Sequence, residues 1–596
     1  MRELDMPAAV TLPITDTLAD IAPRNAAQWP DRVMYTRSLP SGPVDVTAAA
    51  FNDDVRATAK GLMARGIKSG DRVGVLAANS YEWTTLDFAL WTVGACAVPI
   101  YESSSSEQID WIVTDAGVCA VAVGSPALAD KVRSAVTGEC PPIWPVDDRL
   151  LPTLGSEGQQ ISDAELQSRT DDGTPRDTAT IIYTSGTTGQ PKGCELTHAN
   201  FLFEVRTLVA STAPLMAEPG ACTVLFLPLA HIFGRAAQVW CAEGGLRVIH
   251  CAKPKTLTVD MVTFSPTFIV AVPRVFEKIY NASAQKAQDA GRGKIFDRAV
   301  DVAIAYSRAQ YTGSPSVLLR LQHAIFDRLV YAKLRAALGG RAKYAVSGGA
   351  GLGERLGHFF AGIGLLVMEG YGLTETTGPS AFNRPEAPRI GTVGQAMAGT
   401  AVRIADDGEV WLRGPHVMRG YHNNPAATTE AIDPDGWFHT GDIGVLDDDG
   451  YLSITGRKKD IIITAGGKNV APAVLEDRVQ SSRLVSYAMV VGEGRPFIGA
   501  LVTLDEEALA AWVIANDKSE LSAAEVRADP ALQAEVQLAI NHANDAVSKA
   551  ESIRKWTILD GELSEEAGHV TSTQKLKRTV IATDFATEIE ALYTQP

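Results

Sequence analysis

The feature that most constrains the fold is a regular alternation of helix-like and strand-like segments between residues 50 and 130. The helix-like segments are 49–66, 83–95 and 105–117, and the strand-like segments are 71–80, 97–100 and 119–124. The first kind carries apolar residues at helical spacing, and the second is rich in β-branched residues. This rhythm is typical of βαβ units and predicts a mostly parallel sheet covered by helices.

The same pattern continues further along the chain, interrupted by one helical stretch. Strand-like segments recur at 179–184, 221–229, 246–251, 267–273 and 343–349. Between 281 and 340 the pattern is helical, with a break at the turn-forming sequence of 311–316. We therefore expect a helical elaboration of about 281–340 on a sheet-based domain.

The character of the sequence changes after Gly391. Short strands with Asp-Gly turns predict antiparallel hairpins, and the basic sequence GRKKD at 456–460 separates two strands. The remaining residues have strands and a helix of their own, enough for a second, α+β domain. We expect an α/β fold with an N-terminal domain of 1–456, a hinge at 457–460 and a smaller C-terminal domain of 461–596.

Length, charge and cysteine content narrow the class of protein. The chain has 596 residues, too many for one simple core, and a net charge of −16, which argues against nucleic acid as the main partner. Its seven cysteines are scattered, with no C-x-x-C pair, as expected of reduced thiols in a cytoplasmic protein. No apolar run reaches the length of a membrane span, and the N-terminus lacks the apolar core of a signal peptide.

The segment richest in chemistry is IIYTSGTTGQPKG at 181–193. An apolar strand leads into a loop with hydroxyl groups, glycines and a lysine. These are Thr184, Ser185, Gly186, Thr187, Thr188, Gly189 and Lys192. Glycines let the backbone approach a polyphosphate, hydroxyls and N–H groups donate to its oxygens, and the lysine adds charge. Pro191 stands where a Walker A loop has its second glycine, so the loop is of another type.

With this loop and six further segments, the chain resembles the adenylate-forming superfamily of acyl-CoA synthetases, luciferases and peptide-synthetase adenylation domains. The six segments are LPLAHIFG (227–234), SGGAGL (347–352), EGYGLTET (369–376), HTGD (439–442), GRKKDIIITAGGKNVAP (456–472) and TSTQKLKR (571–578). They follow in the order typical of that superfamily and cover roughly residues 45 to 580. The resemblance implies ATP and CoA as substrates, Mg²⁺ as a cofactor and a mobile C-terminal domain.

Residues in these segments suit an adenine nucleotide. The ring of Tyr371, beside Gly370 and Gly372, can stack on adenine, and Thr374 can bond a phosphate. Glu375, with Thr184, offers the hard oxygen ligands that Mg²⁺ prefers. A carboxylate such as Asp442, which follows a Thr-Gly turn, suits the two ribose hydroxyls. The resemblance assigns the purine wall to Gly349 and Ala350, a nucleotide contact to Arg457 and the hinge to Lys459.

The residues expected to act on the reacting groups are His231, Glu375, Arg457 and Lys575. The resemblance places His231 where the acyl carboxylate meets the α-phosphate. Lys575 lies near the C-terminus, and a long cationic side chain on a mobile domain can reach the carboxylate and the leaving phosphate. Four residues after His231, where bacterial long-chain members can carry a tryptophan gate, this chain has Arg235.

The resemblance implies two half-reactions in one site. A fatty acid and ATP form acyl-AMP and pyrophosphate, and the thiol of CoA then displaces AMP. The backbone of 463–469, with Gly466, Gly467, Lys468 and Asn469, would line the thiol tunnel, and Lys575 would serve only the first step. No nucleophilic side chain is needed, which agrees with the absence of a G-x-S-x-G motif.

The resemblance is greatest to long-chain members, including the bubblegum-type and mycobacterial ones. A fatty-acid substrate is compatible with peripheral contact between the protein and a membrane. The sequence does not determine the preferred length of the acyl chain or the oligomeric state. The apolar stretch 261–273 could line an acyl tunnel, although its pattern alone favours sheet core. Two alternatives also stay open: an acyl-AMP ligase that loads a carrier protein, and a nucleotide-binding relative without catalytic activity.

Overall fold

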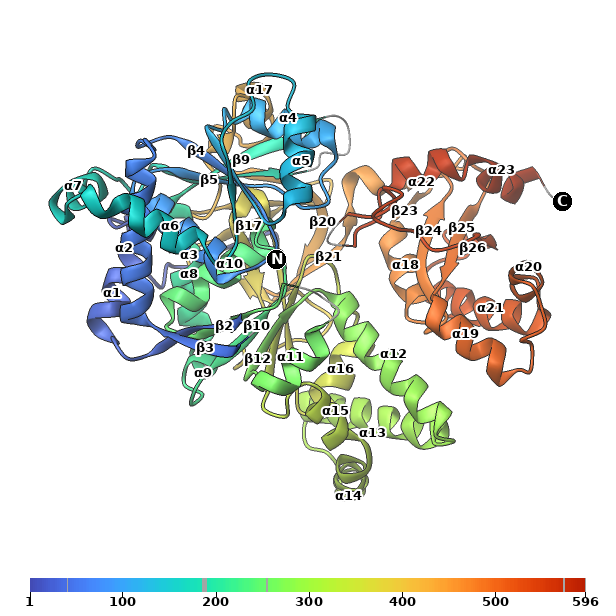
Figure 1. The fold of residues 1–596 in the computed structure, drawn as a ribbon. Helices are drawn as coiled ribbons and strands as arrows, with labels where there is room; N and C mark the ends of the chain where they lie inside the picture. Colours follow the sequence, from blue (N-terminus) through green and yellow to red (C-terminus); the bar gives the residue numbers. More distant parts are fainter. Residues whose placement is uncertain (40, 185–189, 253–255, 572–573, 595–596) are drawn as a thin grey trace.

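The computed structural model describes residues 1–39, 41–184, 190–252, 256–571 and 574–594. A large N-terminal part and a smaller C-terminal part lie side by side and are joined by the chain after strand β21 (Leu452–Arg457) (Figure 1). Both mix helices and strands. The predicted α/β fold with a large and a small domain is confirmed.

The first sheet contains the alternating segments. In spatial order its strands are β19 (Gly420–Tyr421), β9 (Lys192–Thr197), β8 (Thr178–Thr184), β5 (Cys96–Pro99), β4 (Arg72–Leu76), β6 (Ala120–Val123) and β7 (Ile143–Pro145). The five from β8 to β7 are parallel, as expected. The helices of this region are α1 (Ile21–Gln28), α2 (Ala48–Ala64), α3 (Tyr81–Thr92), α4 (Ser106–Asp115), α5 (Pro126–Ala135), α6 (Leu150–Glu157), α7 (Asp163–Asp171) and α8 (His198–Ser211). Each predicted helix between 49 and 117 has formed.

Two further sheets complete the βαβ part. One has the order β10 (Cys222–Leu225), β11 (Arg247–His250), β2 (Val33–Leu39) and β3 (Gly42–Thr47). The other has the order β12 (Phe268–Ala271), β13 (Tyr344–Gly348), β14 (Leu366–Leu373), β15 (Gly378–Phe382) and β16 (Gln395–Ala396). Helix α10 (Ile232–Glu243) follows β10, and α16 (Glu354–Gly362) follows β13. All four residues of β12 are buried, so this part of 261–273 is sheet core.

The helical elaboration forms the lower edge of the molecule in Figure 1. It comprises α12 (Pro273–Asp289), α13 (Gly293–Thr312), α14 (Val317–Phe326), the π-helical turn η4 (Asp327–Tyr331) and α15 (Ala332–Ala337). It begins earlier than predicted because Pro273 occupies the first helical turn, where its missing N–H costs nothing. The break at 311–316 is present, and the Ser316 side chain caps the start of α14.

The hairpins after Gly391 form the predicted antiparallel part. Its sheet has the order β1 (Glu3–Asp5), β17 (Ala401–Ile404), β18 (Glu409–Arg413), β20 (Phe438–Leu446) and β21. One expectation was wrong: Thr440 and Gly441 form no turn but lie inside β20. Gly441 has a φ of +70°, and the pairing with β18 shifts between Glu409, opposite Ile443, and Trp411, opposite His439. A bulge can hold such a glycine within a strand.

The smaller part has its own core. Strands β24 (Val485–Val491), β25 (Ile498–Leu504) and β26 (Ile553–Ile558) form its sheet, beside the short pair β22 (Ile462–Ile463) and β23 (Asn469–Val470). Its helices are α18 (Pro472–Gln480), α19 (Glu506–Ala515), α20 (Ala523–Arg527), α21 (Pro530–Asn544), α22 (Arg578–Asp584) and α23 (Ala586–Thr594). Among the described residues of the whole chain, no helix combines the length and apolarity needed to cross a bilayer.

Candidate active site

Three predicted residues from separate segments meet at one buried carboxylate. The Tyr371 hydroxyl donates to Asp442 Oδ2 at 2.8 Å, and Arg457 Nε donates to Asp442 Oδ1 at 2.9 Å. Asp442 is buried, although Arg457 reaches solvent. Each carboxylate oxygen has a further lone pair. The group can therefore still accept hydrogen bonds from the hydroxyls of a ligand.

Burial fixes the protonation state of Tyr371. Desolvation, followed by the nearby charge of Asp442, raises the pKa of its phenol well above the ordinary value. The hydroxyl therefore stays protonated and remains a donor to Asp442. This arrangement keeps the ring on β14 at a constant position beside the loop that follows β13.

The strand that carries Asp442 is anchored by groups that sequence reasoning missed. Glu409 Oε1 accepts from the Gly441 N–H at 2.8 Å, and Lys458 Nζ lies 3.0 Å from Glu409 Oε2 and 2.6 Å from Asp407. Glu409 is buried and is followed by three apolar residues, Val410 to Leu412, which is the one signal in the sequence that could have marked it. The ion pairs tie Lys458, the second residue of the predicted hinge 457–460, to the large domain.

The expected purine wall lies at the turn from β13 to α16. Gly349 and Ala350 are exposed there, and Gly349 has a φ of +85°, which favours glycine. The glycines of β14 have a structural reason as well. A Cβ at Gly372 would lie 1.8 Å from the Gly378 carbonyl oxygen, and one at Gly370 would lie 3.1 Å from the Phe382 ring.

The predicted phosphate loop connects two antiparallel strands. Thr184 ends β8 and pairs with Lys192, the first residue of β9. The predicted phosphate-binding residues Ser185, Gly186, Thr187, Thr188 and Gly189 lie outside the described residues. Lys192 Nζ stands 5.0 Å from the centroid of the Tyr421 ring, whose hydroxyl donates to Glu375 Oε1 at 2.9 Å. Tyr421, which no motif indicated, thus connects the two charged groups.

The surroundings of Glu375 fit a magnesium ion that arrives with ATP. Glu375 lies in the turn Thr374–Thr376 and is half-buried, while Thr374 is buried. Within the described residues no cluster of three or more His, Cys, Asp or Glu side chains could hold a metal alone. Mg²⁺ commonly takes one or two carboxylates and completes its shell with water and phosphate oxygens. One glutamate near a threonine hydroxyl meets that requirement.

His231 is held as a neutral hydrogen-bond donor. It caps the start of α10, and its Nδ1 accepts from the Phe233 N–H at 3.1 Å. The proton of the neutral ring is therefore on Nε2. Burial, and then the charge of Lys575, lowers the His231 pKa to about 4. At neutral pH the ring can donate to a carboxylate or phosphate oxygen but carries no charge.

Lys575 of the smaller domain faces the site on the large domain. Its pKa is lowered by burial and by the charge of Arg457, against the opposing charges of Asp442 and Glu375. Its backbone N–H donates to the Thr571 hydroxyl at 3.0 Å. Lys575 nevertheless remains accessible to solvent. The structure therefore brings Lys575 together with His231, Glu375, Arg457 and Asp442.

Comparison with known proteins agrees with this geometry. A model of the AMP-binding enzyme family matches residues 22–422, and one of the AMP-binding enzyme C-terminal domain matches residues 459–596. The chain belongs to the AMP-binding enzyme family.

Relatives in this family cover the full chain. Long-chain-fatty-acid–CoA ligase FadD15 of Mycobacterium tuberculosis is 46% identical over 602 residues, which is 100% of both chains. Long-chain-fatty-acid–CoA ligase ACSBG2 of Gallus gallus is 31% identical, over 92% of this chain and 78% of that protein. The solved A domain of carboxylic acid reductase from Segniliparus rugosus, in complex with AMP, has a TM-score of 0.74 at 19% identity. That match covers 97% of this chain and 94% of the solved one and shows a shared fold.

Two of the predicted groups are not brought to this site. Gly466, Gly467, Lys468 and Asn469 are exposed on the loop between β22 and β23. Lys468 Nζ lies 3.3 Å from Glu551 of the same domain, and the neighbouring Ala465 N–H donates to the Arg495 carbonyl oxygen. Lys459 is exposed in the hinge. In this arrangement of the AMP-binding enzyme, Lys575 is directed toward the site, whereas the four residues predicted to contact CoA are not.

Arg235, at the place of the tryptophan gate, is a core residue in this AMP-binding enzyme. Its side chain is fully buried and donates to Asp87 Oδ1 at 2.9 Å, also fully buried. The pair joins α10 to α3. Removing one partner would leave the other charge buried and unpaired, so breaking the pair would be costly. Arg235 therefore belongs to the buried core between these helices.

Proposed function

We propose that the protein is a long-chain fatty acid–CoA ligase that forms AMP and pyrophosphate. The observation that carries the proposal is the buried Asp442 carboxylate, which Tyr371 and Arg457 hold through hydrogen bonds. The charges of Asp442 and Glu375 also act on Lys575 of the smaller domain, which supports a role of Lys575 at the same site. The full-length likeness to ligases named for long-chain fatty acids supports the substrate class. Pathway and preferred chain length are left open.

In the first half-reaction a carboxylate oxygen of the fatty acid attacks the α-phosphorus of ATP, and pyrophosphate leaves. Asp442 would accept from the ribose hydroxyls, with Tyr371, Gly349 and Ala350 along the purine. His231 Nε2–H would donate to an oxygen of the acyl or phosphate group. Lys575 would neutralise charge on the carboxylate and the phosphates.

Mg²⁺ would be held by Glu375, with Thr184 beside it, and would neutralise phosphate charge when bound with ATP. Lys192 and Thr374 would contact phosphate oxygens on the same side. Tyr421 orients Glu375 through its hydrogen bond. We propose the undescribed loop 185–189 as the remaining phosphate contact, on the strength of its hydroxyls and glycines.

In the second half-reaction the thiol sulfur of CoA attacks the acyl carbon, AMP leaves, and the thiol proton is released. We infer that the smaller domain, 461–596, rotates about 457–460 for this step. The exposed loop with Gly466, Gly467, Lys468 and Asn469 would then reach the site, while Lys575 withdraws. Support comes from Lys458, whose ion pairs hold one side of the hinge, and from exposed Lys459 on the other.

We place the reaction in the cytoplasm, with peripheral contact to a membrane as a further proposal.

Burial raises the pKa of the Cys96 thiol to about 12 and of Cys194 well above its ordinary value. Such cysteines stay protonated and do not act as nucleophiles. This agrees with direct attack by the substrates.

Product analysis tests the proposed function. The purified chain is given ATP, Mg²⁺ and a series of fatty acids, with and without CoA, and products are identified by mass spectrometry. We expect AMP, pyrophosphate and acyl-CoA with CoA, and bound acyl-AMP without it. Acyl-AMP that never passes to CoA would favour an acyl-AMP ligase for a carrier protein. No pyrophosphate release with any fatty acid would favour a nucleotide-binding relative without catalytic activity.

A further inference from the structure

The helical elaboration exposes a continuous row of large apolar side chains. The exposed fractions are 83% for Val317, 65% for Leu318, 60% for Leu321, 50% for Ile325 and 52% for Leu329. Apolar side chains scattered singly on a surface are ordinary, but a contiguous apolar surface marks a place of interaction. No residue of α14 is buried.

Basic side chains are interleaved with this row at helical spacing. Arg320, Arg328 and Lys333 are exposed on the same stretch of α14, η4 and α15. We call these three and the five apolar residues the α14 face. The exposed positions from 317 to 333 include no aspartate or glutamate. The face is therefore apolar and positively charged.

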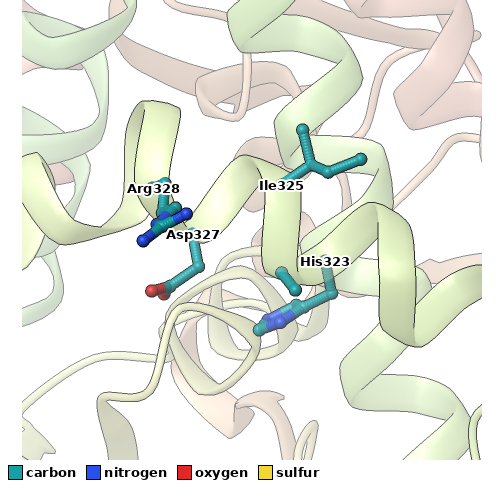
Figure 2. Close-up of a pocket in the computed structure, with 5 residues that line it drawn as sticks. His323, Ile325, Asp327 and Arg328 are labelled. Atoms are coloured by element: carbon teal, nitrogen blue, oxygen red, sulfur yellow. The ribbon is translucent and has the colours of Figure 1, made fainter.

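The opposite side of α14 is occupied by the protein itself. The His323 ring stacks on Tyr306 with 3.9 Å between centroids, and its Nε2 lies 2.6 Å from the Gly362 carbonyl oxygen. Asp327 is paired with Arg335 at 2.7 Å. Figure 2 shows Ile325 pointing away from His323 and Asp327. All three, with Ala324 and Arg328, line a surface pocket of about 600 Å³.

The local charge distinguishes this region from the rest of the chain. The whole protein has a net charge of −16, yet residues 281–340 carry nine Lys and Arg side chains against four Asp. An anionic surface repels most of such a protein and attracts this region. Two copies of the α14 face brought together would set six cations against one another, which disfavours a second copy as the partner.

We propose that the α14 face docks on an anionic lipid bilayer. Its apolar side chains enter the boundary between head groups and acyl chains, while Arg320, Arg328 and Lys333 contact lipid phosphates. Burial of apolar area together with attraction to anionic lipids is what holds an amphipathic helix at a bilayer surface. This rests on the proposed function in one respect: a fatty acid dissolved in the bilayer is then within reach of the enzyme.

Vesicle co-sedimentation of the full-length protein tests the docking. Vesicles of phosphatidylcholine alone are compared with vesicles that also contain phosphatidylglycerol. We expect binding to the anionic vesicles that weakens with added salt. The double substitution Leu321→Glu and Ile325→Glu should weaken it about tenfold or more, since two apolar side chains no longer enter the lipid. Arg320→Gln with Arg328→Gln should weaken it and reduce the dependence on salt.

A matched control uses exposed apolar residues elsewhere. Ile514 on α19 is 70% exposed and Leu538 on α21 is 67% exposed. Ile514→Glu with Leu538→Glu should leave vesicle binding unchanged. Equal loss with this control, unchanged binding of the α14-face variant, or no binding by the wild type would each overturn the proposal. So would light scattering that shows a dimer dissociated by Leu321→Glu and Ile325→Glu, since a second copy would then cover the face.

The enzymatic reaction is measured separately, without vesicles, on a fatty acid supplied below its micelle concentration. We expect the α14-face variants to form acyl-CoA at the wild-type rate. A protein that binds vesicles but makes no acyl-CoA would contradict the proposed function and leave the docking intact. A protein that makes acyl-CoA but does not bind vesicles would overturn the docking alone.

Discussion

The two halves of the active site differ in how their side chains are held. On the large domain Asp442 is buried and bonded to Tyr371 and Arg457, and its strand is anchored through Glu409. On the smaller domain Lys575 is in contact with solvent. The preceding residue, Gln574, has a φ of +65° and accepts from the Tyr487 hydroxyl at 2.5 Å.

Among the described residues, polar contacts join helix α12 to the smaller domain. Arg274 of α12 lies 3.7 Å from Asp505 and has its guanidinium 5.6 Å from the centroid of the Tyr487 ring. Arg483 donates to Gln288. Partly exposed ion pairs contribute about 0–1 kcal/mol each. The proposed nucleotide-binding half of the site, around Asp442, thus belongs to the large domain. The half that carries Lys575 can move with the smaller domain while the hydrophobic core of each domain stays intact.

The largest effect is expected when the Lys575 side chain is removed. Lys575→Ala should lower acyl-CoA synthesis from fatty acid, ATP and CoA about a thousandfold, because one preorganised charge on the transferring group is lost. The rate is followed as AMP formed. Lys577→Ala, on the same segment, is the matched control and should keep near wild-type activity. If both variants behave alike, the loss reflects a general basic patch and the assignment of Lys575 is wrong.

The next effect concerns the nucleotide half. Glu375→Gln should lower pyrophosphate release about a hundredfold and raise the Mg²⁺ concentration required, because a charged ligand becomes a neutral one. The measurement is a Mg²⁺ titration at saturating ATP. Wild-type turnover at high Mg²⁺ would show that Glu375 does not hold the metal.

A smaller effect is expected at the contact between domains. Arg274→Ala should lower the adenylation rate about threefold, since it removes the pair with Asp505 and the contact with Tyr487. Thioester formation from acyl-AMP should not fall. Arg308→Ala, which removes a surface ion pair with Glu354 on the helical elaboration, serves as the control. Equal loss in both half-reactions would mean that Arg274 supports stability and not domain orientation.

The smallest effect is a pH dependence of the domain orientation, through Asp477 on α18. Asp477 keeps contact with solvent, yet desolvation by the protein groups around it, and then the carboxylates of Glu476, Glu277 and Glu369, raise its pKa from 3.8 to about 7. Glu277 and Glu369 belong to the large domain. Ionisation of Asp477 therefore disfavours this orientation, increasingly as the pH rises from about 4 to 7, with no further change above that.

The comparison that isolates this group is wild type against Asp477→Asn. Their ratio of adenylation rates should fall about threefold between pH 5 and 7.5, a modest figure because solvent screens the exposed side chain. A constant ratio over that range would show that ionisation of Asp477 does not influence the domain orientation.

Local sequence patterns predicted the elements better than their contacts. The alternation at 49–124 indicated the parallel strands because burial on both faces leaves a short apolar run. The Thr-Gly pair before Asp442 was misinterpreted as a turn, since a bulged strand has the same residues. The bond from Tyr371 to Asp442, and that from Lys458 to Glu409, joins segments tens of residues apart. No local spacing encodes such pairs.

The same limit applies to surfaces. Helical spacing predicted the helices of 281–340, but it does not say which side another element covers. His323 and Leu321 are two residues apart, and only the fold shows that His323 packs on Tyr306 while Leu321 faces solvent. Burial of Arg235 against Asp87 was equally invisible, because a charged residue on a helix is usually exposed.

The central claim is that Lys575 serves one half-reaction and the fixed nucleotide half serves both. The direct measurement supplies purified acyl-AMP and CoA to Lys575→Ala and follows acyl-CoA in a single turnover, beside adenylation by the same preparation. We predict thioester formation within about threefold of wild type while adenylation falls about a thousandfold. An equal loss in the two half-reactions would contradict the account.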